Sequence, residues 1–174
     1  MNFMDLLKEA GGTGSIGALS KQLGIGDGDT GKLVEALGPA LTRGLQKQTE
    51  NPATLDGLTK ALSGGNHQRY LDDPDLVGRE DAITDGNKIL GHLFGSKDVS
   101  RNVAAQAAQQ TGLESSLIKK ALPLLAGLAM GALSKKGPEN EKSGGLGGLL
   151  GGLLGGGNDG IDLDDVLGLA RKLF

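Results

Sequence analysis

Apolar residues recur at intervals of three and four along nearly the whole chain, which is the spacing of one face of an α-helix. Alternating or β-branched runs long enough to form a strand do not occur. The pattern therefore predicts an all-α, multihelical fold. Its apolar stripes place helices around residues 3–7, 16–23, 33–45, 55–62, 83–94, 99–111, 114–134 and 163–173.

Capping residues indicate where several of these helices begin. Ser15 precedes the second stripe and Asp29 or Thr30 precedes the third, and side chains of these types cap helix N-termini. Asn51 followed by Pro52 is typical of a cap and first helical position, so a fourth helix begins there. The next stretch, 64–78, has no periodicity, and we expect a long surface loop.

Two parts of the chain resemble each other. Gln22-Leu-Gly24-Ile25 aligns with Gln110-Thr-Gly112-Leu113, and Leu37-Gly-Pro39-Ala-Leu41 aligns with Ala121-Leu-Pro123-Leu-Leu125. Proline at both equivalent positions marks a matching kink or helix junction. The alignment predicts a helical domain at 1–136 built from two degenerate repeats, at about 12–65 and 95–136. A chance match between segments rich in Leu and Gly is the alternative.

Glycine accounts for 32 of the 174 residues, well above the usual share of about 7%, and much of the excess lies in the tract from Gly144 to Gly157. We interpret 137–157 as a Gly/Leu-rich linker or assembly tract, and 158–174 as a tail ending in a short helix capped by Asp162. A Gly/Leu helix would need support from a partner, because Gly costs roughly 1 kcal/mol per helical position. The candidate interaction residues are Leu149, Leu150, Leu153 and Leu154.

The charge balance and the absence of Cys exclude several classes of function. The net charge is −3, so there is no overall positive field to attract nucleic acid or acidic membranes. The chain contains no Cys, which excludes disulfides, thiol nucleophiles and Cys-based zinc sites. No basic segment followed by a long apolar run opens the sequence, so the expected location is the cytoplasm.

Two glycine patterns imitate nucleotide-binding motifs. The segment 26–32 has the spacing of a phosphate-binding loop, but Leu33 stands where Ser or Thr should hold magnesium, and Asp27 and Asp29 would repel phosphate. The segment 12–17 matches the dinucleotide fingerprint, yet it follows a predicted helix instead of a strand. Both are interpreted as turns between helices, so no cofactor is expected.

The two histidines, His67 and His92, have no neighbour at metal-ligand spacing, and we place both at the surface or its boundary. Oxygen ligands for His67 would come from Asp72, Asp73 and Asp75 only if the loop folds back. Asp73 before Pro74 is more simply a turn.

An acidic cluster of Asp159, Asp162, Asp164 and Asp165 offers oxygen ligands of the kind that calcium prefers. The spacing is not that of an EF-hand loop. Carboxylates also stabilise a helix N-terminus, and that explanation accounts for the same residues. Weak calcium binding therefore stays an alternative.

The apolar stretch 117–133 is too short for a membrane span. Lys119 and Lys120 interrupt it, which leaves the 13 apolar residues 121–133, whereas a span needs about 20. We therefore expect this segment to be the central core helix, and membrane insertion is not expected.

Several ordered motifs resemble the YidB-like bacterial family, whose function is unknown. They are Tyr70-Leu-Asp-Asp-Pro74, the segment from Gly86 to Gly95, Thr111-Gly-Leu113 leading to Leu122-Pro-Leu-Leu125, and Asp164-Asp-Val-Leu-Gly168. The resemblance implies a multihelical fold and supplies no catalytic residue. Some relatives carry a fuller acidic stretch before the last helix, from which Gly157-Asn-Asp-Gly160 departs.

Together these patterns predict a non-catalytic protein-interaction or self-assembly module whose partner is another protein or a second copy. Catalysis is not expected, because the chain offers no Cys, no usable His pair and no polar residue isolated within an apolar stripe. The alternatives are peripheral membrane or small apolar ligand binding, in which the Leu-rich central helix lines a groove, and weak calcium binding by the C-terminal cluster.

Overall fold

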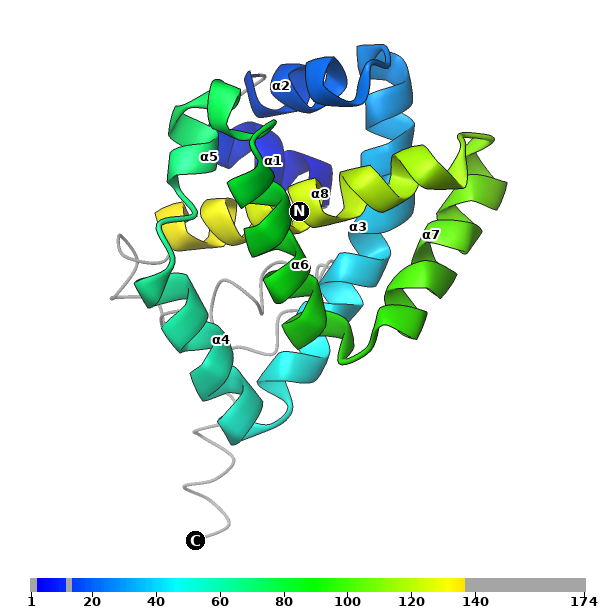
Figure 1. The fold of residues 1–174 in the computed structure, drawn as a ribbon. Coiled ribbons are helices and arrows are strands. Elements are labelled where there is room, and N and C mark those ends of the chain that lie inside the picture. Colours follow the sequence, from blue (N-terminus) through cyan, green and yellow to red (C-terminus); the bar gives the residue numbers. More distant parts are fainter. Residues whose placement is uncertain (1–2, 12–13, 137–174) are drawn as a thin grey trace, which may run out of the picture.

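A computed structural model describes residues 3–11 and 14–136, which form a bundle of crossing helices (Figure 1). No strand lies within these two ranges, so the predicted all-α fold is confirmed. The elements are α1 (Phe3–Gly11), α2 (Gly14–Leu23), α3 (Asp27–Thr49), α4 (Pro52–Gly64), α5 (Arg69–Asp72), the short 3₁₀ helix η1 (Pro74–Leu76), α6 (Glu80–Phe94), α7 (Lys97–Thr111) and α8 (Ser115–Lys136).

Helix α8 runs through the centre of the molecule and contacts every other α-helix of the described chain (Figure 1). All residues from 121 to 133 are buried, so the helix has no solvent-facing side over this length. A helix that is apolar all round needs neighbours all round, and the surrounding helices supply them. By length and composition alone 115–135 could span a membrane, but 78% of its most apolar window is buried inside the protein. The expected core helix is therefore present.

Helix α3 presents one leucine stripe to the core, because residues spaced by four lie on the same side of a helix. Leu33, Leu37, Leu41 and Leu45 are each buried to 1% exposure or less. This stripe lets α3 contact α1, α2 and α6 as well as α7 and α8.

The predicted caps of α2 and α3 are wrong, and the predicted start of α4 is confirmed. Helix α3 begins at Asp27 after Gly26, which has no side chain to cap it, and Asp27 and Asp29 place negative charge in the first turn. Ser15 lies inside α2, where its buried hydroxyl has no hydrogen-bond partner in the described chain. Asn51 does cap α4, accepting a hydrogen bond from the Ala53 amide at 3.0 Å.

The segment 64–78 is not the surface loop that its lack of periodicity predicts. It contains α5 and η1, and it buries Tyr70, Leu71 and Val77 to 6% exposure or less. The sequence of this segment shows no helical periodicity because each of its two elements is only three or four residues long, about one turn. The expected turn at Asp73 is present, since its carboxylate accepts from the Asp75 amide at 3.1 Å and caps η1.

The helix pairs α2–α3 and α7–α8 share the features that suggested a duplication. Each first helix ends at a glycine of positive φ, 67° at Gly24 and 71° at Gly112. Each second helix contains an internal proline, Pro39 or Pro123. The duplication itself stays a prediction.

Close approach of α6 to α8 is made possible by a glycine. A Cβ atom on Gly86 would overlap the backbone of Pro123, so only a residue without a side chain fits at this crossing. Gly91, one and a half turns later on α6, has open space where a Cβ would stand. The helices therefore meet at Gly86 and leave room near Gly91.

Candidate binding groove

A groove of about 470 Å³ lies where α6, α7 and the first turns of α8 meet. It is neither enclosed nor flat, so an occupant would keep one side toward solvent. We name it the α7 groove. Its lining residues are Asn87, Leu90, Gly91, Ser96, Lys97, Ser100, Arg101, Lys119 and Leu122.

The turn between α6 and α7 brings the lining residues together. Gly95 ends α6 at φ 72°, a left-handed conformation that favours glycine, and its amide donates to the Gly91 carbonyl at 3.0 Å. Ser96 then caps α7 by accepting from the Val99 amide at 3.3 Å. This tight turn sets the first residues of α7 beside the last turns of α6.

The floor of the groove is apolar and its rim is cationic. Leu90 and Leu122 are 5% and 2% exposed and belong to the core. Lys97, Arg101 and Lys119 are exposed above them, and no lining residue is acidic. In a chain of net charge −3, this is a local excess of positive charge.

Only one of the three cations has an ion-pair partner among the described residues. Arg101 lies 3.3 Å from Asp98, but both side chains are well exposed, at 67% and 85%, and such surface pairs are weak. Lys97 and Lys119 have no carboxylate within ion-pair distance in that part of the chain. The N-terminal end of α7 adds partial positive charge at the same place. The α7 groove is therefore suited to a negatively charged group attached to an apolar one.

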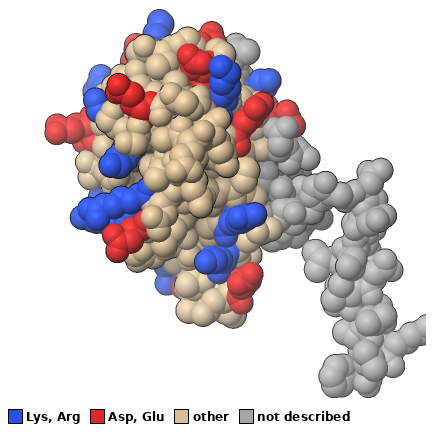
Figure 2. Space-filling view, turned by 90° about the vertical axis from the view of Figure 1, so that its right-hand side faces the viewer, with Lys and Arg blue, Asp and Glu red and all other residues tan. Residues whose placement is uncertain are grey.

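Beyond the groove, the outer face of α7 is uncharged. The helix has no charged residue after Arg101, and its exposed positions include Asn102, Ala105, Gln106 and Gln109. Figure 2 looks onto this side of the molecule and shows a broad uncharged area with Lys, Arg, Asp and Glu side chains around it. Val99, at 41% exposure, is the large hydrophobic side chain that the described chain exposes, and it lies in the first turn of α7.

A second polar cluster joins α5 to α6. The Tyr70 hydroxyl donates to Asp85 at 2.5 Å, and the Arg69 guanidinium donates to the same carboxylate at 3.2 Å and to the Tyr70 oxygen at 2.8 Å. Burial, followed by the hydrogen bond to Asp85, raises the pKa of Tyr70, which keeps it a hydrogen-bond donor. The hydroxyl and the carboxylate are engaged with each other, so the cluster serves to hold α5 in place.

His67 lies beside this cluster and is not at the surface or its boundary. It is 8% exposed, its ring is 6.4 Å from that of Tyr70, and its Nδ1 has no hydrogen-bond partner in the described chain. Burial is the main reason that its pKa lies below the usual 6.5. Sequence reasoning missed both His67 and the Arg69–Tyr70–Asp85 cluster, because it interpreted 64–78 as a surface loop. His92, by contrast, is exposed as expected.

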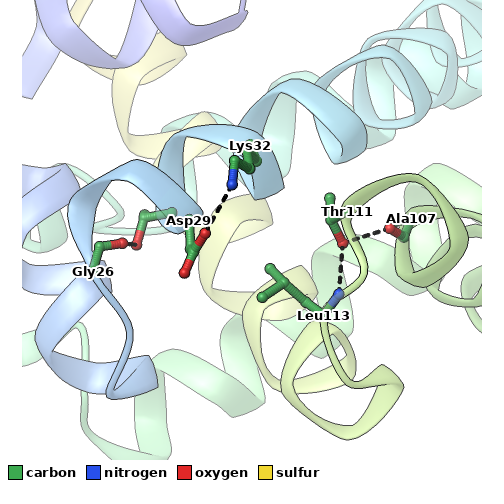
Figure 3. Close-up of polar contacts among 7 residues, drawn as sticks. Gly26, Asp29, Lys32, Ala107, Thr111 and Leu113 are labelled. Carbon is green, nitrogen blue, oxygen red and sulfur yellow. Dashed lines mark hydrogen bonds and ion pairs between the residues drawn. The ribbon is translucent and has the colours of Figure 1, made fainter.

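The phosphate-loop pattern at 26–32 forms the first turn and a half of α3, directly after α2. Asp29 lies 3.2 Å from Lys32, the residue that would have to reach a phosphate (Figure 3). At the corner between α7 and α8, the Thr111 hydroxyl donates to the Ala107 carbonyl and accepts from the Leu113 amide (Figure 3). Asp29 and Lys32 thus pair with each other within α3, and Thr111 closes the end of α7.

Those candidate metal ligands that belong to the described residues do not lie together. Asp72 pairs with Lys135 at 2.9 Å, Asp73 caps η1, and residues 3–11 and 14–136 contain no group of His, Asp and Glu side chains that could hold a metal. The acidic candidates Asp159, Asp162, Asp164 and Asp165 lie outside the described residues. So do the interaction candidates Leu149, Leu150, Leu153 and Leu154.

A family model described as "Bacterial protein of unknown function (DUF937)" matches residues 5–136. The match covers more than half of the chain, ends with α8, and is consistent with the YidB-like resemblance. Comparison with curated proteins and with solved structures returned no match.

Proposed function

We propose that this chain, which belongs to the DUF937 family of bacterial proteins, is a non-catalytic interaction module that binds an acidic, partly apolar segment of another protein in the α7 groove. The observation that carries the proposal is the convergence of Lys97, Arg101 and Lys119 over the apolar floor, with no acidic residue in the lining.

A polypeptide suits this surface better than a small apolar ligand. Pockets for small molecules bury most of their ligand and are lined mainly by apolar groups, whereas this groove is open and rimmed by cations. Depletion of charge is typical of the core of protein interfaces, and the outer face of α7 extends such a surface away from the groove. Aspartate or glutamate beside leucine or valine would place carboxylates at the rim and an apolar group over Leu90 and Leu122.

The test is an NMR titration of the ¹⁵N-labelled full chain with an amphipathic peptide of leucine and aspartate. Asp162, Asp164 and Asp165 are replaced by Asn in this chain, so that its own carboxylates do not compete for the groove. We expect amide shifts concentrated on Gly91, Ser100 and Lys119. The same peptide with asparagine in place of aspartate should bind at least about tenfold more weakly, because it loses the charge complementarity.

Two matched variants separate the groove from general charge attraction. Lys97→Glu with Lys119→Glu places negative charge on the rim and should abolish the shifts. Lys88→Glu with Lys120→Glu makes the same change in net charge at exposed positions on α6 and α8 outside the lining, and should retain most of the binding. Equal loss in both variants, or shifts that avoid the groove, would overturn the proposal.

A further inference from the structure

We infer that the chain's own acidic segment, residues 158–167, occupies the α7 groove and regulates access to it. The inference rests on the proposed function, because a tail held in the groove competes with a partner. The segment reads Asn-Asp-Gly-Ile-Asp-Leu-Asp-Asp-Val-Leu, and it carries four carboxylates and no basic residue.

Charge and apolar content match between the segment and the groove. Asp159, Asp162, Asp164 and Asp165 face a rim of three cations, two of which have no ion-pair partner among the described residues. Ile161, Leu163, Val166 and Leu167 lie among these carboxylates and provide apolar groups for the floor. The segment therefore carries both the negative charges and the apolar side chains that the lining of the groove is suited to bind.

The length of the connection also fits. Lys119, at the groove, and Lys136, where α8 ends, are 17 residues apart on one helix, which corresponds to about 26 Å at 1.5 Å per residue. The connecting residues 137–157 number 21, and ten of them are glycine. A glycine-rich chain of this length has a root-mean-square end-to-end distance of about 25 Å, from 5–6 Å times the square root of the residue number.

A linker of this length can reach roughly 70 Å when extended, enough to pass around the bundle, and it gives the tethered group a local concentration on the order of millimolar. Even a weak contact between carboxylates and surface cations is then populated within one molecule. A second copy would have to supply the same segment at the far lower concentration of the free protein. The own-chain segment is thus the favoured occupant.

The test uses the absence of Cys from the full chain, which allows a single pair to be introduced cleanly. Ser100→Cys lines the groove, and Gly160→Cys lies in the acidic segment. We expect mild oxidation to form an intramolecular disulfide at least about tenfold faster than in a control with Ala53→Cys, on the exposed side of α4, and Gly160→Cys. Non-reducing electrophoresis and mass spectrometry measure the rates.

Charge swapping identifies the contact. Lys97→Glu with Lys119→Glu should bring the rate down to that of the control, and adding Asp164→Lys with Asp165→Lys should restore it. Equal rates for the groove pair and the control pair would overturn the inference, and so would a disulfide-linked dimer whose yield rises with protein concentration, because the occupant would then be a second copy.

The peptide titration distinguishes failure of this inference from failure of the proposed function. If the tail occupies the groove, the unmodified chain binds the acidic peptide severalfold more weakly than the chain with Asn at 162, 164 and 165. If cross-linking runs at the control rate while the peptide still shifts Gly91 and Ser100, the tail inference is wrong and the groove remains a binding site.

Discussion

Burial of His67 couples the stability of the fold to pH on the acidic side of neutrality. Burial lowers its pKa below 6.5 in the folded protein, so the unfolded chain binds more protons as the pH falls below that value. His67 therefore does not reduce the free energy of unfolding above pH 6.5. As the pH falls from 6.5 toward the lower folded-state pKa, the free energy of unfolding decreases.

We predict that His67→Gln makes the stability less sensitive to pH between 7.5 and 5.5, as measured by urea unfolding at each pH. His92→Gln changes an exposed position and leaves His67 in place, so it should retain the wild-type pH dependence. An unchanged slope in His67→Gln would show that His67 does not couple folding to protonation.

At the scale of elements, the crossing of α6 and α8 depends on Gly86. We predict that Gly86→Ala lowers the free energy of unfolding by about 1–3 kcal/mol, because the added Cβ meets the Pro123 backbone, which cannot move aside like a flexible side chain. Gly91→Ala is the matched control on the same helix: its Cβ meets nothing, so it should raise stability by up to about 1 kcal/mol. Urea denaturation of both variants gives the comparison, and equal destabilisation would contradict the crossing geometry.

The elements differ in how far the sequence predicts them. Two long helices were predicted at the right place. The leucine stripe from Leu33 to Leu45 predicted α3, and the long apolar run predicted α8. The burial of His67 and Tyr70 was unpredictable because α5 spans only four residues. The groove could not be predicted from the sequence for another reason. Its residues Asn87, Lys97 and Lys119 belong to three helices, and only the packing of these helices brings them together. The i, i+4 pair of Lys97 and Arg101 was the one local signal of its charge.

At the scale of the whole molecule, protection from hydrogen exchange should follow the distance from the centre. We predict that amides of residues 126–133 exchange only through global unfolding, because every side of α8 is covered there. Among the side chains of α4 whose burial is described, only Leu58 and Leu62 are buried, so its amides should open locally and exchange faster. Native-state exchange measured by NMR checks the order, and equal protection in α4 and α8 would contradict it.

The central position of α8 sets the order in which this protein can be made and folded. The ribosome synthesises seven α-helices before the one that all of them contact. Until residue 133 has emerged, those helices present apolar faces with no common partner, so the domain cannot be completed from its N-terminus as synthesis proceeds. Folding of the nascent chain into this bundle therefore requires α8 to have left the ribosome, and the earlier helices keep apolar surface exposed until then.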